Sequence, residues 1–406
     1  MHILYYHQYF TTPSGATGTR SYEMALRLVK RGHKVTMVCG SNVQGDTGLS
    51  GLFVKGQRTG WVDGIRVIEF ELSYSNYMSL PKRAVVFIQF AFKCMLLSLT
   101  EKVDLIFATT TPLTAGIPGI VAGILRRKPF VFEVRDLWPE LPRAMGVVTN
   151  PLVLLGMNIL EWFSYHAATS CIGLAPGIVD GIVKRGIPRN KVALIPNGSD
   201  LDLFRPMPEI KRDLPDVTEN DFVAMFCGAH GKANGLYAVL DVAAVLKKMD
   251  RLDIKFLFIG DGREKPALMQ RAEEQDLSNC IFMSPIPRLE MPAIMNQVDV
   301  GLMILDNVPA FYRGTSPNKF FDYIASGLPV INNYPGWLAE LIVKNECGIA
   351  VPPEEPEAFA EAMIEFADDP ALVKRMGANA RQLAEREFDR DVLGERFVKW
   401  LEQATQ

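Results

Sequence analysis

The chain has 406 residues, of which 48% are hydrophobic and 22% charged, with a net charge of −3 and neither low-complexity tracts nor internal repeats. This composition predicts a soluble globular protein, and the length allows two domains of roughly 200 residues. Residues 1–200 hold 21 Lys and Arg against 13 Asp and Glu, a net of +8, whereas residues 201–406 hold 22 against 33, a net of −11. The basic half predicts an anionic partner. Because no nucleic-acid module or basic–aromatic stripe is visible, we expect a membrane surface or a lipid phosphate rather than nucleic acid.

The cysteines and the first residues predict a cytoplasmic protein. The six cysteines are scattered, with neither a Cys-x-x-Cys pair nor metal-ligand spacing, so we expect reduced core residues. They are Cys39, Cys94, Cys171, Cys227, Cys280 and Cys347. Met1–Tyr6 lacks the basic region and apolar run of a signal peptide and predicts a buried strand instead.

Short β-rich runs alternate with helical stretches along the chain. The expected strands are Ile3–Tyr6, Lys34–Cys39, Ile65–Phe70, Leu105–Thr109, Phe130–Val134, Ser170–Leu174, Val192–Ile195, Phe222–Cys227, Lys255–Ile259, Ile281–Met283, Val300–Ile304 and Val330–Asn332. The expected helices include Gly18–Arg31, Gly235–Met249, Lys265–Glu274 and Leu289–Asn296. This alternation predicts two parallel sheets covered by helices, with a boundary near Asn197–Pro215, where prolines interrupt regular structure.

The loop after the first expected strand, His7–Gly18, is a candidate ligand site. Ligands of doubly wound folds bind outside the carboxyl ends of the parallel strands. Gly15 and Gly18 permit close approach of the backbone, whose N–H groups suit phosphate or sugar oxygens. A purely structural turn is the alternative.

Two apolar segments are candidates for membrane contact. Pro81–Leu99 is apolar apart from Gln89 and Lys93 and opens with Lys82 and Arg83. Leu113–Lys128 ends in three consecutive basic residues. There are three readings: buried helices beside a sheet, peripheral docking of residues 81–99 on an anionic bilayer, or a transmembrane helix. We expect reversible membrane association.

The loop after Phe130–Val134 brings charged groups to the end of a strand. Arg135, Asp136 and Glu140 follow that strand beside Trp138, whose ring is suited to stacking on a sugar. Asp136 or Glu140 is the candidate acid or base on the acceptor side, and a structural Asp–Arg pair is the alternative.

The loop after Phe222–Cys227 contains Gly228, Gly231 and Lys232 ahead of a helix. Glycines and a lysine at a helix N-terminus suit a pyrophosphate.

A helix near residue 320 begins with a phosphate-binding pattern. Ser316 is expected to cap this helix, followed by a proline at the first helical position. Its free N–H groups and Lys319 favour an anion. Asp322 shares a face with Asn318 and Lys319, one turn from the anion, where a carboxylate suits the hydroxyls of a ribose. An ordinary capped amphipathic helix is the alternative.

Six motifs in this order resemble the retaining glycosyltransferases of family 4, which have the GT-B fold. They are Pro13–Gly18 with Ala25–Val35, Ile195–Asp200 with Phe204, Phe258–Gly262, Pro317–Val330, Glu346–Val351 and Asp369-Pro370. The Arg135-Asp136 pair stands where many members have histidine, which is similar to a subgroup that builds bacterial surface polysaccharides.

The resemblance implies an α/β protein with two Rossmann-like, doubly wound domains facing a cleft. Residues 1–198 would bind the acceptor, residues 199–385 would bind a nucleotide-sugar, and a helix within 386–406 would pack back on the first domain. The implied reaction moves a sugar, with retained anomeric configuration, from a UDP-linked donor to a lipid-linked or oligosaccharide acceptor. We therefore expect a cytoplasmic enzyme at the inner face of the cell membrane.

The resemblance also assigns donor contacts. It implies that the backbone approaches the donor at Gly15, Ala16, Gly228 and Gly260, and that the backbone of Ile286 reads a uracil-type base. In the turn that contains Gly15 the family usually has two adjacent glycines, and in this chain the second of them is replaced by Ala16.

Further donor contacts are implied for Ser316, Asn318 and Asp322, with Lys232 displaced by two residues from the usual lysine position. Lys319 would stabilise negative charge on the leaving diphosphate. The family's first glutamate, eight residues before Asp322, is replaced by Gly314.

We expect no cofactor and no metal, because neither Asp-x-Asp pattern, at 200–202 or at 389–391, follows a suitable strand. The alternatives are a nucleotide-sugar epimerase of the same fold and a non-catalytic partner protein. A dinucleotide oxidoreductase lacks support, since no Gly-x-Gly-x-x-Gly turn follows the first strand.

Overall fold

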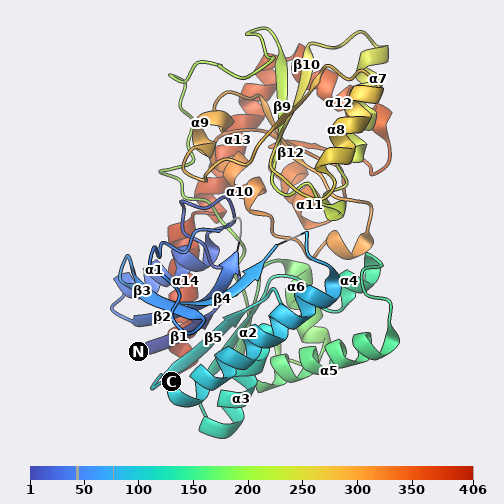
Figure 1. The fold of residues 1–406 in the computed structure, drawn as a ribbon. Coiled ribbons are helices and arrows are strands. Elements are labelled where there is room, and N and C mark those ends of the chain that lie inside the picture. Colours follow the sequence, from blue (N-terminus) through green and yellow to red (C-terminus); the bar gives the residue numbers. More distant parts are fainter. Residues whose placement is uncertain (43–44, 76, 406) are drawn as a thin grey trace. The chain divides into compact units, whose positions relative to one another are not determined.

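The computed structural model describes residues 1–42, 45–75 and 77–405, which divide into two compact units. Unit 1 comprises Met1–Asn197, Arg313–Ser316 and Asp391–Gln406, and unit 2 comprises Gly198–Tyr312 and Pro317–Arg390. Each unit is an α/β layered structure with its own sheet (Figure 1). This confirms the predicted fold class of two largely parallel sheets covered by helices.

The sheet of unit 1 has eight strands in the order β3-β4-β2-β1-β5-β6-β7-β8. They are β1 (His2–Tyr6), β2 (Lys34–Asn42), β3 (Gln57–Val62), β4 (Ile65–Tyr74), β5 (Leu105–Thr109), β6 (Phe130–Val134), β7 (Ser170–Gly173) and β8 (Val192–Leu194). Seven of these were expected within a few residues. The edge strand β3 was not, because its exposed positions carry no hydrophobic run; it pairs antiparallel with β4.

The helices of unit 1 cover both faces of this sheet. They are α1 (Arg20–Lys30), α2 (Leu80–Thr100), α3 (Gly116–Arg126), α4 (Glu140–Ala144), α5 (Pro151–Ala167), α6 (Pro176–Lys184) and α14 (Arg390–Gln403), with 3-10 turns η1 (Leu113–Ala115) and η2 (Arg189–Lys191). The last helix belongs to this unit because the fully buried Phe397 packs against Phe107 of β5, with ring centroids 5.1 Å apart.

The sheet of unit 2 has six parallel strands in the order β11-β10-β9-β12-β13-β14. They are β9 (Phe222–Cys227), β10 (Ile254–Ile259), β11 (Cys280–Met283), β12 (Val300–Met303), β13 (Val330–Asn332) and β14 (Gly348–Ala350). The helices are α7 (Tyr237–Lys248), α8 (Lys265–Glu274), α9 (Met291–Met295), α10 (Asn318–Ala325), α11 (Trp337–Lys344), α12 (Pro356–Asp368) and α13 (Pro370–Glu387), with 3-10 turns η3 (Lys232–Asn234) and η4 (Pro309–Phe311). A cluster of buried aliphatic and aromatic side chains between the sheet and α7 and α12 forms its core.

The strand order reverses once in each unit. In unit 1 the chain departs in opposite directions from β1 and β5, and in unit 2 from β9 and β12. Loops at the carboxyl ends of such strands separate and leave a crevice, which is where doubly wound folds bind ligands. The loops after β1 and β9, which the sequence singles out, therefore lie at the expected points.

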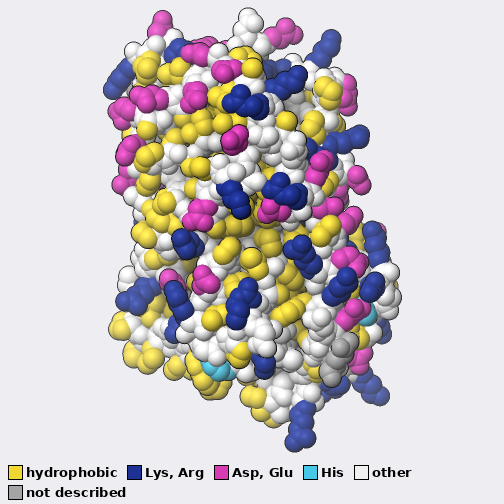
Figure 2. All heavy atoms as spheres, turned by 180° about the vertical axis from the view of Figure 1, so that it is seen from behind, with side chains coloured by type: hydrophobic (Ala, Val, Ile, Leu, Met, Phe, Trp, Pro, Cys, Tyr) yellow, Lys and Arg dark blue, Asp and Glu magenta, His cyan; other side chains and the backbone are white. Residues whose placement is uncertain are grey.

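Two helices of unit 1 expose apolar side chains. Helix α2 is long and apolar enough to cross a membrane by length and composition alone, and 22% of its most apolar window is buried. Helix α5 is exposed along most of its length, and Figure 2 shows hydrophobic side chains gathered where it lies, at the lower left. The reading of residues 81–99 as a buried helix beside a sheet therefore holds for one side of α2, which is buried, and the other side faces solvent.

Candidate functional site

Lys319 lies in the first turn of α10 and points to the carboxyl end of β9. Its ammonium nitrogen is 3.5 Å from the centroid of the Phe226 ring, and a side chain at Gly228 would come within 3.2 Å of it. Among the described residues no carboxylate lies within ion-pair distance of this amine. Burial lowers the pKa of Lys319 from 10.5 to about 8. The site thus holds a half-buried cation without a counter-ion.

Tyr323, one turn along α10, fixes the helix against β9. Its hydroxyl donates to the carbonyl of Met225 at 3.1 Å and accepts from the N–H of Cys227 at 3.0 Å. The Tyr323 ring also packs on Gly301 of β12, where an added Cβ would collide with it. These contacts reach both β9 and β12, the two strands between which the strand order of unit 2 reverses, and they set the position of Lys319. We call this place the switch point.

The start of α10 differs from the prediction. The helix begins at Asn318, and Pro317 precedes it in an extended conformation. Ser316 does not cap the helix; its hydroxyl accepts the N–H of Asn197 at 3.0 Å, and Asn197 also donates to the carbonyl of Ser316. Neither Ser316 nor Pro317 contributes a side-chain cap, so the first amides of α10 keep their capacity to bind an anion.

Asp322 is almost fully buried and already holds a cation. Arg288 donates to both of its oxygens, at 2.7 and 2.8 Å, and Ser199 donates to Oδ1 at 2.8 Å. Each carboxylate oxygen accepts about two hydrogen bonds, so Oδ1 is saturated and Oδ2 retains one acceptor site. The predicted ribose contact is limited to that one position. The Arg288 guanidinium also stacks on Phe204, 4.6 Å from its centroid.

Gly228 and Gly260, near the switch point, form backbone hydrogen bonds and close contacts within unit 2. The amide of Gly228 donates to Ile259, and that of Gly260 donates to Met283, so neither is available to a phosphate. Gly260 has a positive φ of 145°, and a side chain there would collide with the Gly228 carbonyl. The amides of these two glycines are thus engaged within the fold, and Gly228 leaves room for Lys319; the predicted approach of the backbone to a donor at these glycines stays a prediction.

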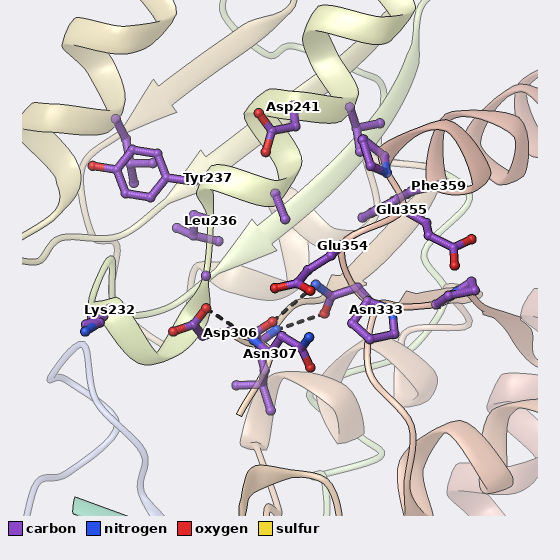
Figure 3. Close-up of a pocket in the computed structure, with 18 of the residues that line it drawn as sticks. Lys232, Leu236, Tyr237, Asp241, Asp306, Asn307, Asn333, Glu354, Glu355 and Phe359 are labelled. Atoms are coloured by element: carbon purple, nitrogen blue, oxygen red, sulfur yellow. Dashed lines mark hydrogen bonds between the residues drawn. The ribbon is translucent and has the colours of Figure 1, made fainter. Parts of the chain in front are cut away.

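A pocket of about 550 Å³ lies beyond the loop after β9 (Figure 3). Its wall includes the carboxylates of Asp241, Glu264, Asp306, Glu354 and Glu355. The exposed Lys232 also lines the pocket, but these five carboxylates outnumber it and disfavour a diphosphate. Ile286 does not line this pocket; it lies half-buried in the loop after β11.

His230, in the loop after β9, was not singled out by the sequence. Both of its ring nitrogens are buried and lack hydrogen-bond partners, and the ring contacts Phe226, Phe258 and Phe282. Burial, with the charges of Lys265 and Lys319, lowers the pKa of His230 to about 4. The ring is therefore neutral at physiological pH.

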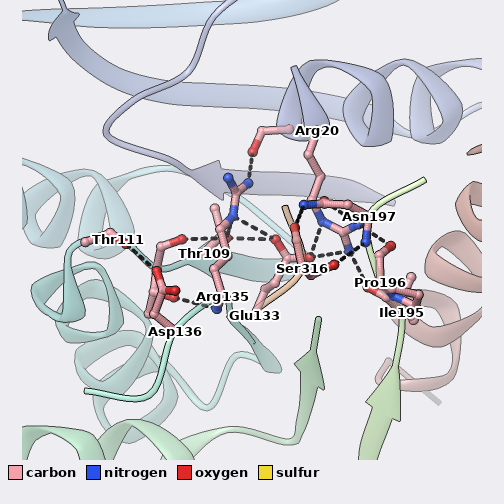
Figure 4. Close-up of polar contacts among 12 residues, drawn as sticks. Arg20, Thr109, Thr111, Glu133, Arg135, Asp136, Ile195, Pro196, Asn197 and Ser316 are labelled. Carbon is pink, nitrogen blue, oxygen red and sulfur yellow. Dashed lines mark hydrogen bonds and ion pairs between the residues drawn. The ribbon is translucent and has the colours of Figure 1, made fainter. Parts of the chain in front are cut away.

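In unit 1, Glu133 at the end of β6 is the centre of a buried polar network (Figure 4). Arg20 donates to Glu133 Oε2 at 2.8 and 3.0 Å, and Thr109 donates to Oε1 at 2.8 Å. Burial alone would raise the pKa of Glu133, but the charges of Arg20 and Arg135 lower it. Glu133 is therefore a structural anion that orients Arg135, which also donates to Ser21.

Asp136 lies beside this network and is half-buried. Its carboxylate accepts from Thr111 at 3.4 Å, and burial raises its pKa despite the nearby charge of Arg135. Glu140 is exposed at the start of α4, the five-residue helix after β6. Of the two candidates, Asp136 has the environment that tunes a carboxylate for proton transfer.

The loop after β1 differs from its predicted role. Gly15 is buried, its amide donates to the Thr12 carbonyl, and a side chain there would collide with Thr11. Gly15 is therefore required by the packing of the loop, and Ala16 is exposed; the donor contacts predicted for both residues stay predictions. Sequence reasoning missed His7 and Gln8, which are buried in the same loop with side-chain nitrogen and oxygen atoms that lack partners.

No group of three or more His, Cys, Asp or Glu side chains suited to a metal ion occurs within the described part of the chain. Asp200 and Asp202 do not converge; Asp200 instead accepts the backbone N–H groups of residues 202 and 203.

Two family matches cover most of the chain. Residues 15–198 match the family described as "Glycosyl transferase 4-like domain" and residues 221–369 match "Glycosyl transferases group 1".

Three curated proteins are similar in sequence. The capsular polysaccharide biosynthesis glycosyltransferase CapM of Staphylococcus aureus is 19% identical over 82% of this chain and 86% of its own length. D-inositol 3-phosphate glycosyltransferase of Corynebacterium urealyticum is 26% identical, over 48% of this chain and 47% of its own. The putative colanic acid biosynthesis glycosyltransferase WcaL of Escherichia coli K12 is 23% identical, over 54% and 53%. The chain thus spans about half the length of the last two.

Solved structures with the GT-B architecture superpose on nearly the whole chain. Sucrose-phosphate synthase from Thermosynechococcus elongatus gives a TM-score of 0.75 at 18% identity, covering 99% of this chain and 98% of the other. HepE from Anabaena in complex with UDP-glucose gives 0.69 at 18% identity, covering 99% and 100%. At these identities the likeness shows the fold.

Proposed function

Because the chain is a glycosyltransferase of the group 1 and family 4-like class with the GT-B fold, we propose that it moves a sugar from a nucleotide-diphospho-sugar held by unit 2 to an acceptor held by unit 1. The transfer retains the configuration of the anomeric carbon. Relatives named as transferases favour this reaction over epimerisation of a nucleotide sugar.

The observation that carries the proposal is the uncompensated cation at the switch point of unit 2. Lys319 lies at the start of α10, next to amides without a side-chain cap and over a strand end that is the usual ligand position of such folds. A diphosphate would supply the missing counter-ion. The acidic pocket of Figure 3 is an unfavourable place for the same group.

We propose a UDP-linked donor. HepE, which shares the fold, has been solved in complex with UDP and with UDP-glucose. One relative from Corynebacterium glutamicum is named as GDP-mannose-dependent, so GDP is the nucleotide to test beside UDP.

The chemistry requires the anomeric carbon–oxygen bond to the diphosphate to break while the acceptor oxygen bonds to the same carbon from the same face. The acceptor proton passes to the departing diphosphate, whose developing charge Lys319 stabilises. Asp136 accepts a hydrogen bond from the acceptor hydroxyl and orients it for attack. Lys319 and the α10 amides neutralise the diphosphate in this scheme, and we propose that no metal is required.

The acceptor is, in our proposal, a lipid-linked or oligosaccharide intermediate of a bacterial surface polysaccharide. CapM, WcaL and the amylovoran biosynthesis glycosyltransferase AmsK of Erwinia amylovora carry such names. The enzyme would then act at the inner face of the cell membrane, which it contacts through residues 81–99.

Calorimetric titration with UDP, GDP and ADP, each with magnesium and with EDTA, tests the donor site. UDP binding that survives EDTA and is lost in Lys319→Met supports the proposal, and Lys248→Met, which removes an exposed lysine at the end of α7, is the matched control. Equal binding by Lys319→Met and the wild type would refute the site. UDP titration of Lys232→Met shows whether Lys232 supplies the charge of the family's usual lysine, from which it is displaced by two residues.

The reaction is tested by incubating the donor that binds with lipid-linked and oligosaccharide acceptors and determining the anomeric configuration of the product by NMR. An inverted product would refute retention. An epimeric nucleotide sugar formed without acceptor would replace the transferase proposal.

A further inference from the structure

Helix α2 carries two apolar stripes instead of one. Val86, Phe90, Cys94 and Ser98 recur every four residues and are buried on the sheet. On another side, Val85, Ile88, Phe92 and Leu96 are 47–63% exposed. A helix at the surface of a globular protein normally turns polar residues outward. The exposed stripe of α2 is therefore unexplained by the packing of unit 1.

Helix α5 buries mainly polar residues and exposes large apolar ones, the reverse of an ordinary surface helix. Its buried residues are Glu161, Ser164 and Tyr165, and Glu161 forms an ion pair with Arg185. Its large apolar residues face solvent. Leu152, Val153, Leu155, Ile159, Trp162 and Phe163 are 45–77% exposed.

Helix α3 connects these two surfaces. It packs against both α2 and α5, and all three helices cover the sheet of unit 1 (Figure 1). At its carboxyl end Ile124 and Leu125 are 66% and 67% exposed. Because all three bury one side on the same sheet, their outer sides face the same direction. We call this surface, formed by the exposed apolar residues of α2, α3 and α5, the three-helix face.

The charges around the three-helix face are mostly basic, and Glu101, which follows α2, already forms an ion pair with Arg66. Lys82 at the start of α2 and Arg127 just after α3 are exposed, and Lys128 follows. Glu161, the acidic residue within the three helices, is buried and already paired. An apolar surface with a basic rim matches the interfacial region of an anionic bilayer. A second copy of the chain is a poorer match, because a symmetric contact would place the basic rims together.

We propose that the three-helix face lies on the surface of an anionic bilayer, with its apolar side chains inserted among the lipids. This rests on the bilayer contact proposed above for residues 81–99 and adds α3 and α5 to it. The arrangement is interfacial rather than spanning, because crossing the membrane would remove Phe90 and Cys94 from the core of unit 1. It places an acceptor carried on a lipid beside the unit that we propose to bind it.

Co-sedimentation with vesicles of phosphatidylcholine alone, or mixed with phosphatidylglycerol, tests the proposal. The wild type should bind the anionic vesicles more tightly, and more so at low salt. Ile88→Ser/Phe92→Ser on α2 and Trp162→Ser/Phe163→Ser on α5 should each weaken binding about tenfold or more. Val343→Ser, at a position 62% exposed on unit 2, is the matched control and should bind as the wild type does.

Thermal melting and UDP titration of every variant separate this proposal from the donor site. Variants that stay folded and bind UDP normally but lose vesicles support the three-helix face even if transfer activity is never found. A wild type that ignores anionic vesicles refutes the bilayer contact as a whole. If the α5 variant binds vesicles as tightly as the wild type does, the contact is confined to α2. If light scattering shows a dimer that the variants dissociate, the face is occupied by a second copy of the chain. Either outcome overturns the proposal.

Discussion

Replacing Lys319 with methionine should stabilise the protein while it weakens donor binding. The pKa of Lys319 falls from 10.5 to about 8 on burial, which corresponds to about 3 kcal/mol of destabilisation of the charged amine in the folded state. Methionine keeps the length and apolar stem of lysine but loses the contact with the Phe226 ring, worth about 1 kcal/mol. The variant should therefore be about 2 kcal/mol more stable.

The pH dependence identifies the cause. Below pH 8 the amine is charged in both folded and unfolded chains, so the full cost is present. Between pH 8 and 10.5 the folded amine is neutral while the unfolded one is still charged, and the cost disappears as pH rises. The stability difference between Lys319→Met and the wild type should be constant below pH 8 and shrink above it.

Calorimetric melting and UDP titration of the same preparations measure both effects. The gain of about 2 kcal/mol should raise the Tm of a unit of this size by roughly 4–8 °C. UDP affinity should fall about 10–100-fold, the effect of one hydrogen bond to a charged group. A variant with a lower Tm and unchanged UDP affinity would refute the reasoning, because Lys319 would then be a packing residue.

Four further substitutions, one of them a control, test other parts of the structure. Asp136→Asn should lower kcat by about 100-fold or more with the donor Kd unchanged, and Glu140→Gln, at the exposed neighbouring carboxylate, should stay near wild type; equal losses would remove the distinction. Because the pKa of Asp136 is raised by burial, wild-type kcat should fall on acidification as this carboxylate becomes protonated. Glu133→Gln should destabilise unit 1 by about 3–5 kcal/mol in urea unfolding, since Arg20 keeps its charge without a partner; a loss below 1 kcal/mol would contradict that role. Gly301→Ala should lower the Tm and weaken UDP binding together, because the new methyl group displaces α10; unchanged binding would show that α10 need not be held in place.

Much of the fold could be predicted because parallel strands buried on both faces leave continuous hydrophobic runs. Leu105–Thr109 and Phe130–Val134 were predicted with the bounds that the structure gives them. Strand β3 alternates exposed and half-buried residues at an edge, so its pattern resembles a polar loop. The position of Lys319 in the first turn of α10 also followed from local sequence, because helix starts have local signals.

The side-chain pairings of the site could not be predicted. Asp322 is held by Arg288 and Ser199, which lie 34 and 123 residues away in the chain, and no local pattern reports such contacts. Ser316 has the features of a helix cap, but a tertiary contact to Asn197 replaces the cap. Glycines are equally ambiguous, since Gly15 and Gly260 make room for the chain's own backbone or side chains rather than for a ligand.

The return of α14 to the first sheet has a consequence for synthesis on the ribosome. Phe107 of β5 meets Phe397 only after nearly the entire polypeptide has been made. At translation rates of about 5–20 residues per second, residues 198–390 take roughly 10–40 s to emerge. During this interval the nascent N-terminal portion lacks its final helix and exposes part of the hydrophobic surface that α14 covers. Unit 1 can therefore reach its complete fold only after the residues of unit 2 have been synthesised.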